Sequence, residues 1–124
     1  MRKAVRRESA TSGNTVLVRT ASGRIDRSTD GGQSWTNERA GLTDRIQVTL
    51  CPTATACWLG ADNGAVFVRT TDGEWVRRVV PPPAAAVERI VALDDQHATV
   101  ELTDGRRYVT VNGGITWTVP PPQP

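Results

Sequence analysis

The chain has 124 residues, of which 38% are hydrophobic, and its formal net charge is +2. A chain of this length makes one domain or one part of a repeat protein, and its hydrophobic content is that of a globular protein rather than a disordered one. The chain contains fifteen basic and thirteen acidic residues, and this balance is too even for a nucleic-acid-binding surface. The sequence also has no apolar run near the roughly 18 residues that a membrane-spanning helix needs.

The first elements in chain order are a basic N-terminal segment, residues 1–12, and a β-rich run from Thr15 to Thr20. Polar residues follow the basic start where a signal peptide would have an apolar stretch, so no secretion signal is predicted. Within this segment, Ala4 to Glu8 is expected to form the first strand of the first repeat unit. It lies as far before Gly23 as the predicted strand from Arg45 to Leu50 lies before Gly64 in the second unit.

A unit of about forty residues then occurs three times. Polar turns end on Gly23, Gly64 and Gly105, at intervals of 41 residues. Glycine supplies the positive φ that a tight hairpin turn needs, so each turn predicts a hairpin between the β-rich runs beside it. The other predicted strands are Arg45 to Leu50, Ala56 to Gly60, Val87 to Ala92 and His97 to Leu102, and a last strand begins at each recurring tryptophan, at Trp35 to Glu38, Trp75 to Val80 and Trp117 to Val119.

Four short strands per unit, with no predicted helix, are typical of the antiparallel blades of a β-propeller. We therefore expect an all-β, β-propeller-type repeat of about three four-stranded antiparallel blades over residues 13–119. The blades are placed at roughly 4–40, 41–81 and 84–119, and residues 120–124 form a proline-rich tail. Closed propellers have about four to eight blades, so the sequence predicts a fragment, an association of copies that completes a ring, or an open array.

The box from Ser28 to Trp35 and its counterparts carry a family resemblance. The pattern Ser/Thr-x-Asp-x-Gly-x-Thr/Ser-Trp is similar to the Asp-box, or bacterial neuraminidase repeat, while Ala56 to Trp75 resembles the propeller family of photosystem II assembly and stability factors. Relatives of that family occur in non-photosynthetic bacteria, some as domains of membrane-anchored regulators. The resemblance implies structural Asp-box residues at Ser28, Asp30, Gly32, Trp35, Asp72, Gly73, Trp75, Asn112, Gly114 and Trp117.

The box residues also have a physical interpretation. A carboxylate at Asp30 can accept hydrogen bonds from backbone N–H groups a few residues further on, and the glycines relax the backbone demands of a tight loop. Asn112 keeps a carbonyl acceptor, so the turn can survive that replacement. The tryptophan that ends the box is suited to packing where one sheet meets its neighbour.

The resemblance implies a non-catalytic binding or scaffolding domain that contacts a protein partner or senses a ligand, as in bacterial envelope proteins. The alternative is a carbohydrate-binding or sialidase-like Asp-box propeller fragment. Sialidases resembling this repeat use an arginine cluster and a Tyr–Glu pair, but no Glu can be assigned beside Tyr108, the one tyrosine. We therefore expect no enzymatic activity and no catalytic residue. The candidate binding residues are Arg69, Arg106, Arg107 and Tyr108.

Cys51 and Cys57 lie at the end of one predicted strand and the start of the next. If these strands pair, the two sulfurs are close enough for a disulfide, the alternative being two reduced thiols. A disulfide favours an extracytoplasmic, periplasmic domain of an anchored or secreted parent, and reduced thiols favour the cytoplasm. Two cysteines and the distant His97 do not make a four-ligand zinc set, so no metal or cofactor is predicted. Trp58 is expected in the core.

Overall fold

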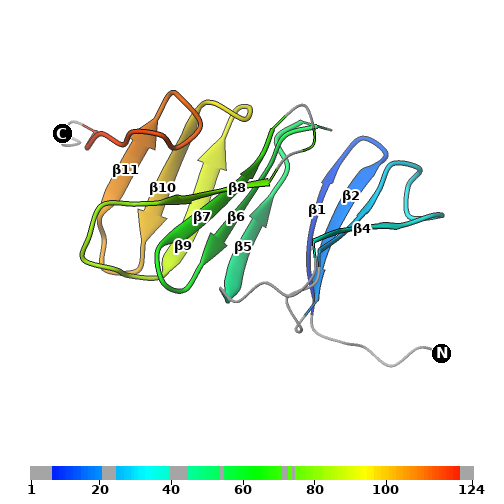
Figure 1. Cartoon of the computed structure of the whole chain (residues 1–124), viewed down its shortest axis with the longest axis horizontal. Helices are drawn as coiled ribbons and strands as arrows, with labels where there is room; N and C mark the ends of the chain where they lie inside the picture. The colour runs from blue at the N-terminus through cyan, green and yellow to red at the C-terminus, as the bar shows by residue number, and fades with distance from the viewer. Residues whose placement is uncertain are drawn as a thin grey trace.

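The computed structural model describes residues 7–20, 25–39, 45–53, 55–70, 73 and 75–120. These residues form eleven β-strands in three antiparallel sheets that lie side by side in one row (Figure 1). This part of the chain contains no helix that could cross a membrane. The predicted all-β, blade-like architecture is confirmed, with one sheet for each repeat unit.

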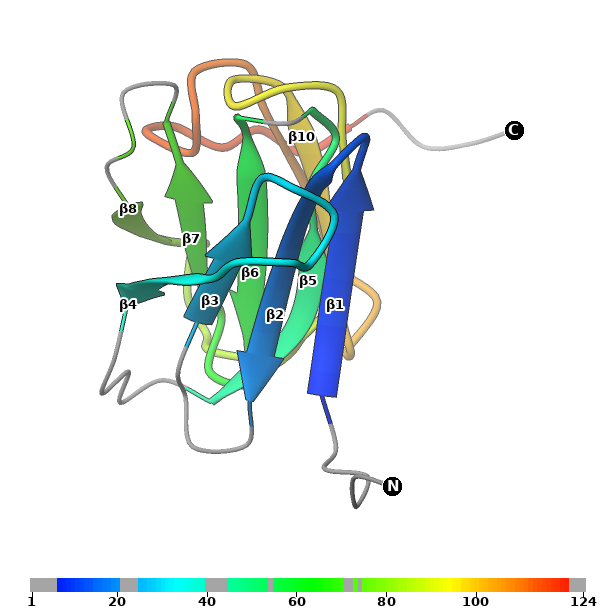
Figure 2. The same ribbon diagram turned by 90° about the vertical axis from the view of Figure 1, so that its right-hand side faces the viewer.

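The strands follow one another along the chain and pair with their sequence neighbours. The first sheet contains β1 (Arg7–Ser12), β2 (Thr15–Thr20), β3 (Ile25–Ser28) and β4 (Thr36–Arg39), in that order, and faces the viewer in Figure 2. The second contains β5 (Ile46–Leu50), β6 (Cys57–Ala61), β7 (Ala65–Arg69) and β8 (Trp75–Val79). The third contains β9 (Val87–Ala92), β10 (Ala98–Leu102) and β11 (Arg107–Thr110).

Most predicted strands agree with the structure to within one residue at either end, and the first and last strands differ more. The first strand is described over Arg7–Ser12, so it extends beyond the predicted end at Glu8, and the predicted start at Ala4 lies outside the described part of the chain. The predicted last strand, Trp117 to Val119, is reduced to a single bridge in which the backbones of Val109 and Thr118 exchange hydrogen bonds of 2.7 and 2.8 Å. Proline has no amide hydrogen, so Pro120 cannot continue this pairing. The predicted turn at Gly23 and the tail at 121–124 also lie outside the described residues.

The first and second sheets bury an apolar layer between them. Leu17 and Ile25 from the first sheet and Leu59 from the second are completely buried, and Phe67 is 1% exposed. Fully burying a side chain of this kind stabilises a fold by about 1.5–3 kcal/mol relative to leaving it exposed. This layer fixes the first sheet against the second.

A second apolar layer fills the space between the second and third sheets. Trp58, Val66, Val87 and Val100 are all completely buried in it. The indole Nε1 of Trp58 donates a 2.8 Å hydrogen bond to the backbone carbonyl of Asp94, so the buried polar atom has a partner. The prediction that Trp58 lies in the core is confirmed. Both faces of the second sheet are therefore covered, one by the first sheet and the other by the third sheet.

Candidate functional site

The first box is a short loop organised around one carboxylate. The backbone N–H groups of Gln33 and Ser34 donate to Asp30 Oδ1 at 3.0 and 2.9 Å, and the Ser28 hydroxyl donates to the same oxygen at 2.7 Å. Ser28 Oγ accepts in turn from the N–H of Gly32 at 2.9 Å. Donors from Ser34 and Ser28 hold the pKa of the Asp30 carboxyl well below its usual range. The carboxylate is thus used by the loop itself.

The third box repeats the same bonds with other side chains. Asn112 Oδ1 accepts from the Thr116 N–H at 3.0 Å and from the Thr110 hydroxyl at 2.9 Å, while the Gly114 N–H donates to Thr110 Oγ1 at 2.8 Å. The side-chain amide of Asn112 donates to Thr116 Oγ1 at 2.8 Å. At the equivalent place in the first box the direction is reversed, because Asp30 accepts from the Ser34 hydroxyl. The amide carbonyl of Asn112 therefore replaces a carboxylate in this turn.

The second box is described only in part. Asp72 lies outside the described residues, whereas Gly73 has a φ of 88° and donates its N–H to the Thr70 carbonyl at 2.9 Å. A positive φ of this size is accessible to glycine at little cost. Gly73 thus serves a tight turn.

The box tryptophans differ in burial and in the groups that they contact. Trp75 packs on the first apolar layer, and its Nε1 donates to Glu38 Oε1 on β4 at 3.1 Å. Trp117 packs on the second layer. Trp35 is 45% exposed, and its Nε1 donates to the Gly32 carbonyl of its own loop at 3.0 Å. Of the three box tryptophans, Trp35 therefore presents the largest fraction of its side chain to solvent.

Arg69 is a structural residue in this fold. It is 8% exposed and lies between the first two sheets, where its Nε donates to Glu38 Oε1 at 2.5 Å and its Nη1 donates to the Thr55 carbonyl at 3.2 Å. Arg27 lies near the pair, and burial together with the Arg69 charge lowers the pKa of Arg27, with Glu38 opposing the shift. The sequence placed Arg69 among the candidate binding residues, but its donors face the protein.

Arg106 and Tyr108 form a second internal contact. Arg106 donates to Asp104, to the carbonyls of Pro81 and Pro83, and to the Tyr108 hydroxyl at 3.1 Å. Its guanidinium carbon also lies 5.8 Å from the centre of the Tyr108 ring. The Tyr108 hydroxyl and the Asp104 carboxylate raise the pKa of Arg106. Arg106 thus anchors the proline-rich connection between the second and third sheets.

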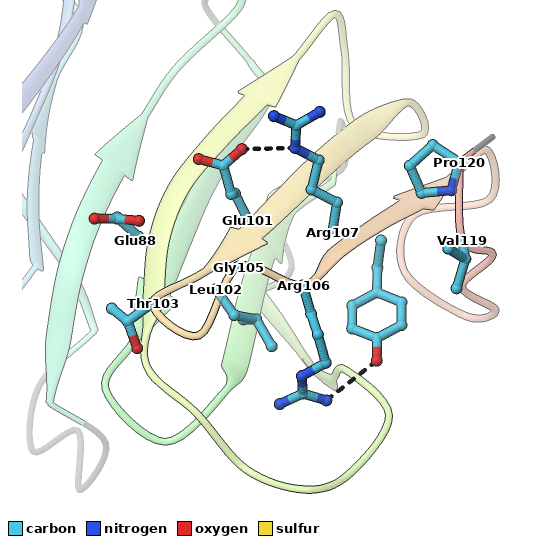
Figure 3. A pocket seen from close by; sticks show the side chains of 10 residues that line it. Glu88, Glu101, Leu102, Thr103, Gly105, Arg106, Arg107, Val119 and Pro120 are labelled. Atoms are coloured by element: carbon cyan, nitrogen blue, oxygen red, sulfur yellow. Dashed lines mark hydrogen bonds and ion pairs between the residues drawn. The ribbon is translucent and has the colours of Figure 1, made fainter. Parts of the chain in front are cut away.

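Arg107 faces the other way from its neighbour and lines a groove (Figure 3). Its Nε donates to Glu101 Oε2 at 2.8 Å, and the two side chains are 49% and 27% exposed. The groove has a volume of about 750 Å³. We call it the hairpin groove, because the hairpin of β10 and β11 builds most of it. Its lining consists of Glu88, Glu101, Leu102, Thr103, Gly105, Arg106, Arg107, Tyr108, Val119 and Pro120.

The structure therefore brings together three of the four candidate binding residues, Arg106, Arg107 and Tyr108, and leaves Arg69 elsewhere. Sequence reasoning missed Glu101, which lies directly opposite Arg107 in the hairpin register. The predicted turn at Gly105 could have placed this pair, because cross-strand neighbours follow from the position of a hairpin turn.

The groove combines charged and apolar contacts rather than a metal-binding arrangement. The described residues contain no group of three His, Cys, Asp or Glu side chains that could hold a metal ion. His97 belongs to a turn, where its ring nitrogen lies 3.0 Å from Asp94 Oδ1. Such a groove can bind a partner through ion pairs and buried apolar area.

Cys51 and Cys57 are joined by a disulfide with a sulfur–sulfur distance of 2.04 Å. Both residues are at most 6% exposed and belong to the layer between the first two sheets. The bond closes the connection from β5 to β6, away from the hairpin groove.

No family model and no curated protein matches this sequence. Among solved structures, "YCF48 bound to D1 peptide" matches with a TM-score of 0.76 and 20% identity, over 94% of this chain and 39% of that one. "YCF48 from Cyanidioschyzon merolae" matches with a TM-score of 0.71 and 21% identity, over 95% of this chain and 38% of that one. The chain thus spans less than half the length of these structures. At the level of the fold, it is part of a YCF48-like β-propeller.

Proposed function

We propose that this chain is a non-catalytic, protein-binding part of a β-propeller, and that the hairpin groove takes an extended segment of a partner protein. The observation that supports this proposal most directly is a groove of about 750 Å³ whose lining combines a solvent-accessible ion pair with the exposed side chain of Val119. A structure of similar fold was solved with a peptide bound, which supports the same class of ligand here.

The lining favours a peptide over a small polar ligand. Val119 is 74% exposed and Pro120 follows it, so one wall offers apolar area that a bound side chain would cover. The side chains of the Arg107–Glu101 pair in the same groove are 49% and 27% exposed, and exposed pairs contribute only about 0–1 kcal/mol. A charged group of a partner protein can therefore replace Arg107 or Glu101 in this ion pair at low cost.

The shared hydrogen-bond pattern of the first and third boxes supports their assignment as Asp-boxes with a structural role.

A pair of matched variants tests the groove. Val119 in the groove is 74% exposed and Leu93 outside it is 75% exposed, so Val119→Asn and Leu93→Asn remove similar exposed apolar groups. A D1 peptide and peptides selected from a random display library serve as probes in fluorescence anisotropy. We expect Val119→Asn to weaken binding about fivefold, or about 1 kcal/mol, and Leu93→Asn to leave it unchanged.

Failure of every peptide probe to bind, or equal binding by Val119→Asn, would contradict the proposed groove. The carbohydrate alternative has its own signature in the same assay series. Binding to a sialylated glycan array without any peptide binding would favour a sialidase-like propeller fragment over a protein-binding one.

We also propose an extracytoplasmic, oxidising setting, which the Cys51–Cys57 disulfide supports because such bonds persist in oxidising compartments. Protein extracted from its source cells under trapping conditions should resist alkylation by a maleimide until it is reduced. Immediate alkylation of both cysteines would instead place the protein in a reducing compartment.

A further inference from the structure

The third sheet ends the row of three sheets and presents one of its faces outward (Figure 1). We call this the outer face. The opposite face, with Ala98, Val100 and Leu102, is buried against the second sheet. The outer face contains two cross-strand rows, Arg89–Glu101–Arg107 and Val91–Thr99–Val109.

This face differs at two positions from the faces that pack against a neighbouring sheet. Thr99 and Arg107 occupy positions that are filled by completely buried apolar side chains one and two repeat periods earlier. These counterparts are Trp58 and Leu17 for Thr99, and Val66 and Ile25 for Arg107. Burying the Arg107–Glu101 pair in the same way would carry a desolvation cost. The outer face therefore departs from both of the sheet-to-sheet interfaces present in the chain.

The same face nevertheless exposes a cluster of apolar side chains. Val91, Leu93 and Val111 are 51%, 75% and 65% exposed. They line a hollow of about 240 Å³ together with Ala92 and Val109. Contiguous exposed apolar surface of this kind marks an interaction site more often than single exposed residues do.

Charge is distributed unevenly along this face. At one end, Arg89 and Arg107 flank Glu101. At the other end, beyond Leu93, the turn carries Asp94 and Asp95. The apolar row lies between a more basic end and an acidic end. Rotating a second copy by 180° about an axis along the apolar row places the basic end of each copy opposite the acidic end of the other.

We propose that two copies of this chain associate face to face through their outer faces, about a twofold axis along the Val91–Thr99–Val109 row. The apolar rows pack on each other, and Arg89 of each copy faces the Asp94–Asp95 turn of its partner. A twofold interface needs this kind of self-complementary patch. The arrangement differs from head-to-tail completion of a ring, which would cover Thr99 and Arg107 with a blade.

The size of the face sets the strength of the association. Three strands about 4.8 Å apart, with about five residues each, give a face on the order of 250 Å² before loops are added. Stable interfaces bury about 800 Å² per partner. The dimer is therefore weak and forms with increasing concentration, which places it in the range that sedimentation velocity can follow.

A charge swap tests this geometry directly. In the described part of the chain, the side chains of Arg89 and Asp95 make no hydrogen bond or ion pair, so each can be reversed without breaking an internal contact. Arg89→Asp and Asp95→Arg should each raise the dimer dissociation constant about tenfold or more, as expected for like charges brought together. The double variant should restore it to within about twofold of the wild-type value.

Sedimentation velocity over a concentration series, at low and high salt, provides the readout, with circular dichroism to verify folding. Leu93→Asn should also weaken the dimer, whereas Val119→Asn in the hairpin groove should not, so failure here is separable from failure of peptide binding. A monomer at every concentration, or no rescue by the double variant, would overturn the proposal. Association lost in Trp35→Ala but kept in Leu93→Asn would instead show a head-to-tail contact through the first sheet.

Discussion

Asp30 and Asn112 organise equivalent loops although one carries a charge and the other does not. In both loops the acceptor oxygen receives an N–H from four residues further on and a hydroxyl from two residues before. Every partner lies within a few positions in the sequence. The residue types therefore predicted the backbone N–H bonds to Asp30 and the carbonyl acceptor of Asn112, but not the hydroxyl bonds from Ser28 and Thr110.

The difference in charge predicts a difference in pH dependence. The folded-state pKa of Asp30 is depressed, so its stabilising effect is present above its unfolded pKa of about 4 and is lost as pH falls toward the folded value. Urea midpoints measured from pH 7 down to pH 2 should show wild-type protein losing more stability below about pH 4 than Asp30→Asn does. The reciprocal variant, Asn112→Asp, should gain acid sensitivity. Parallel curves for all three proteins would contradict this interpretation.

Arg69 illustrates what residue types alone could not predict. An arginine in a strand is compatible with a binding site or with a buried ion pair, and the choice depends on what lies opposite. Its partner Glu38 is 31 positions away and belongs to another sheet. Only the packing of two sheets brings these groups together.

At the scale of elements, most strands were predicted to within one residue, and the last strand of the third unit was not. β2 and β9 match their predicted bounds, because β-branched runs beside a turn are a local signal. The last strand of each unit depends on pairing along an exposed edge. In the third sheet the segment after Trp117 forms one bridge only, since Pro120 follows it. A tryptophan at the expected place did not by itself specify a strand.

The connection between β5 and β6 predicts a measurable contribution from its disulfide. Closing a loop with a sequence separation of 6 should stabilise the fold by about 2 kcal/mol in the chain-entropy model. Denatured, unreduced protein should therefore show no free thiol, and reductant should lower the urea midpoint. The Cys51→Ala/Cys57→Ala protein is the control, and reductant should not change its midpoint. Two titratable thiols in the unreduced protein would exclude the bond.

At the scale of the whole molecule, the sheets are joined by apolar layers and by side-chain hydrogen bonds that reach from one sheet to the next. The close approach of the second and third sheets depends on Gly60, where a Cβ atom would lie 2.5 Å from Val87 Cγ1. Between the first two sheets, Glu38 accepts from both Arg69 and Trp75. The polar contact is therefore a bridge between two sheets rather than a surface ion pair.

Removing this bridge should destabilise the molecule strongly. The Arg69 and Glu38 side chains are 9% and 14% exposed, so Glu38→Ala leaves a buried guanidinium without its counter-charge. We expect a loss of about 3 kcal/mol in the free energy of unfolding, measured by urea titration. Glu38→Gln, which keeps an acceptor, should lose less. The exposed Glu88→Ala is the matched control, and an equal effect of both alanine variants would argue against a buried bridge.

The sequence by itself determined the repeat, the hairpins and the box turns of this protein, because these features depend on hydrogen bonds and side-chain alternation among near neighbours. It could not assign Arg69 to the interior or distinguish the exposed Trp35 from the partly buried Trp75. Those outcomes depend on which sheet faces which. The tertiary structure decided them, since burial and charge pairing arise only when residues distant in the chain share an interface.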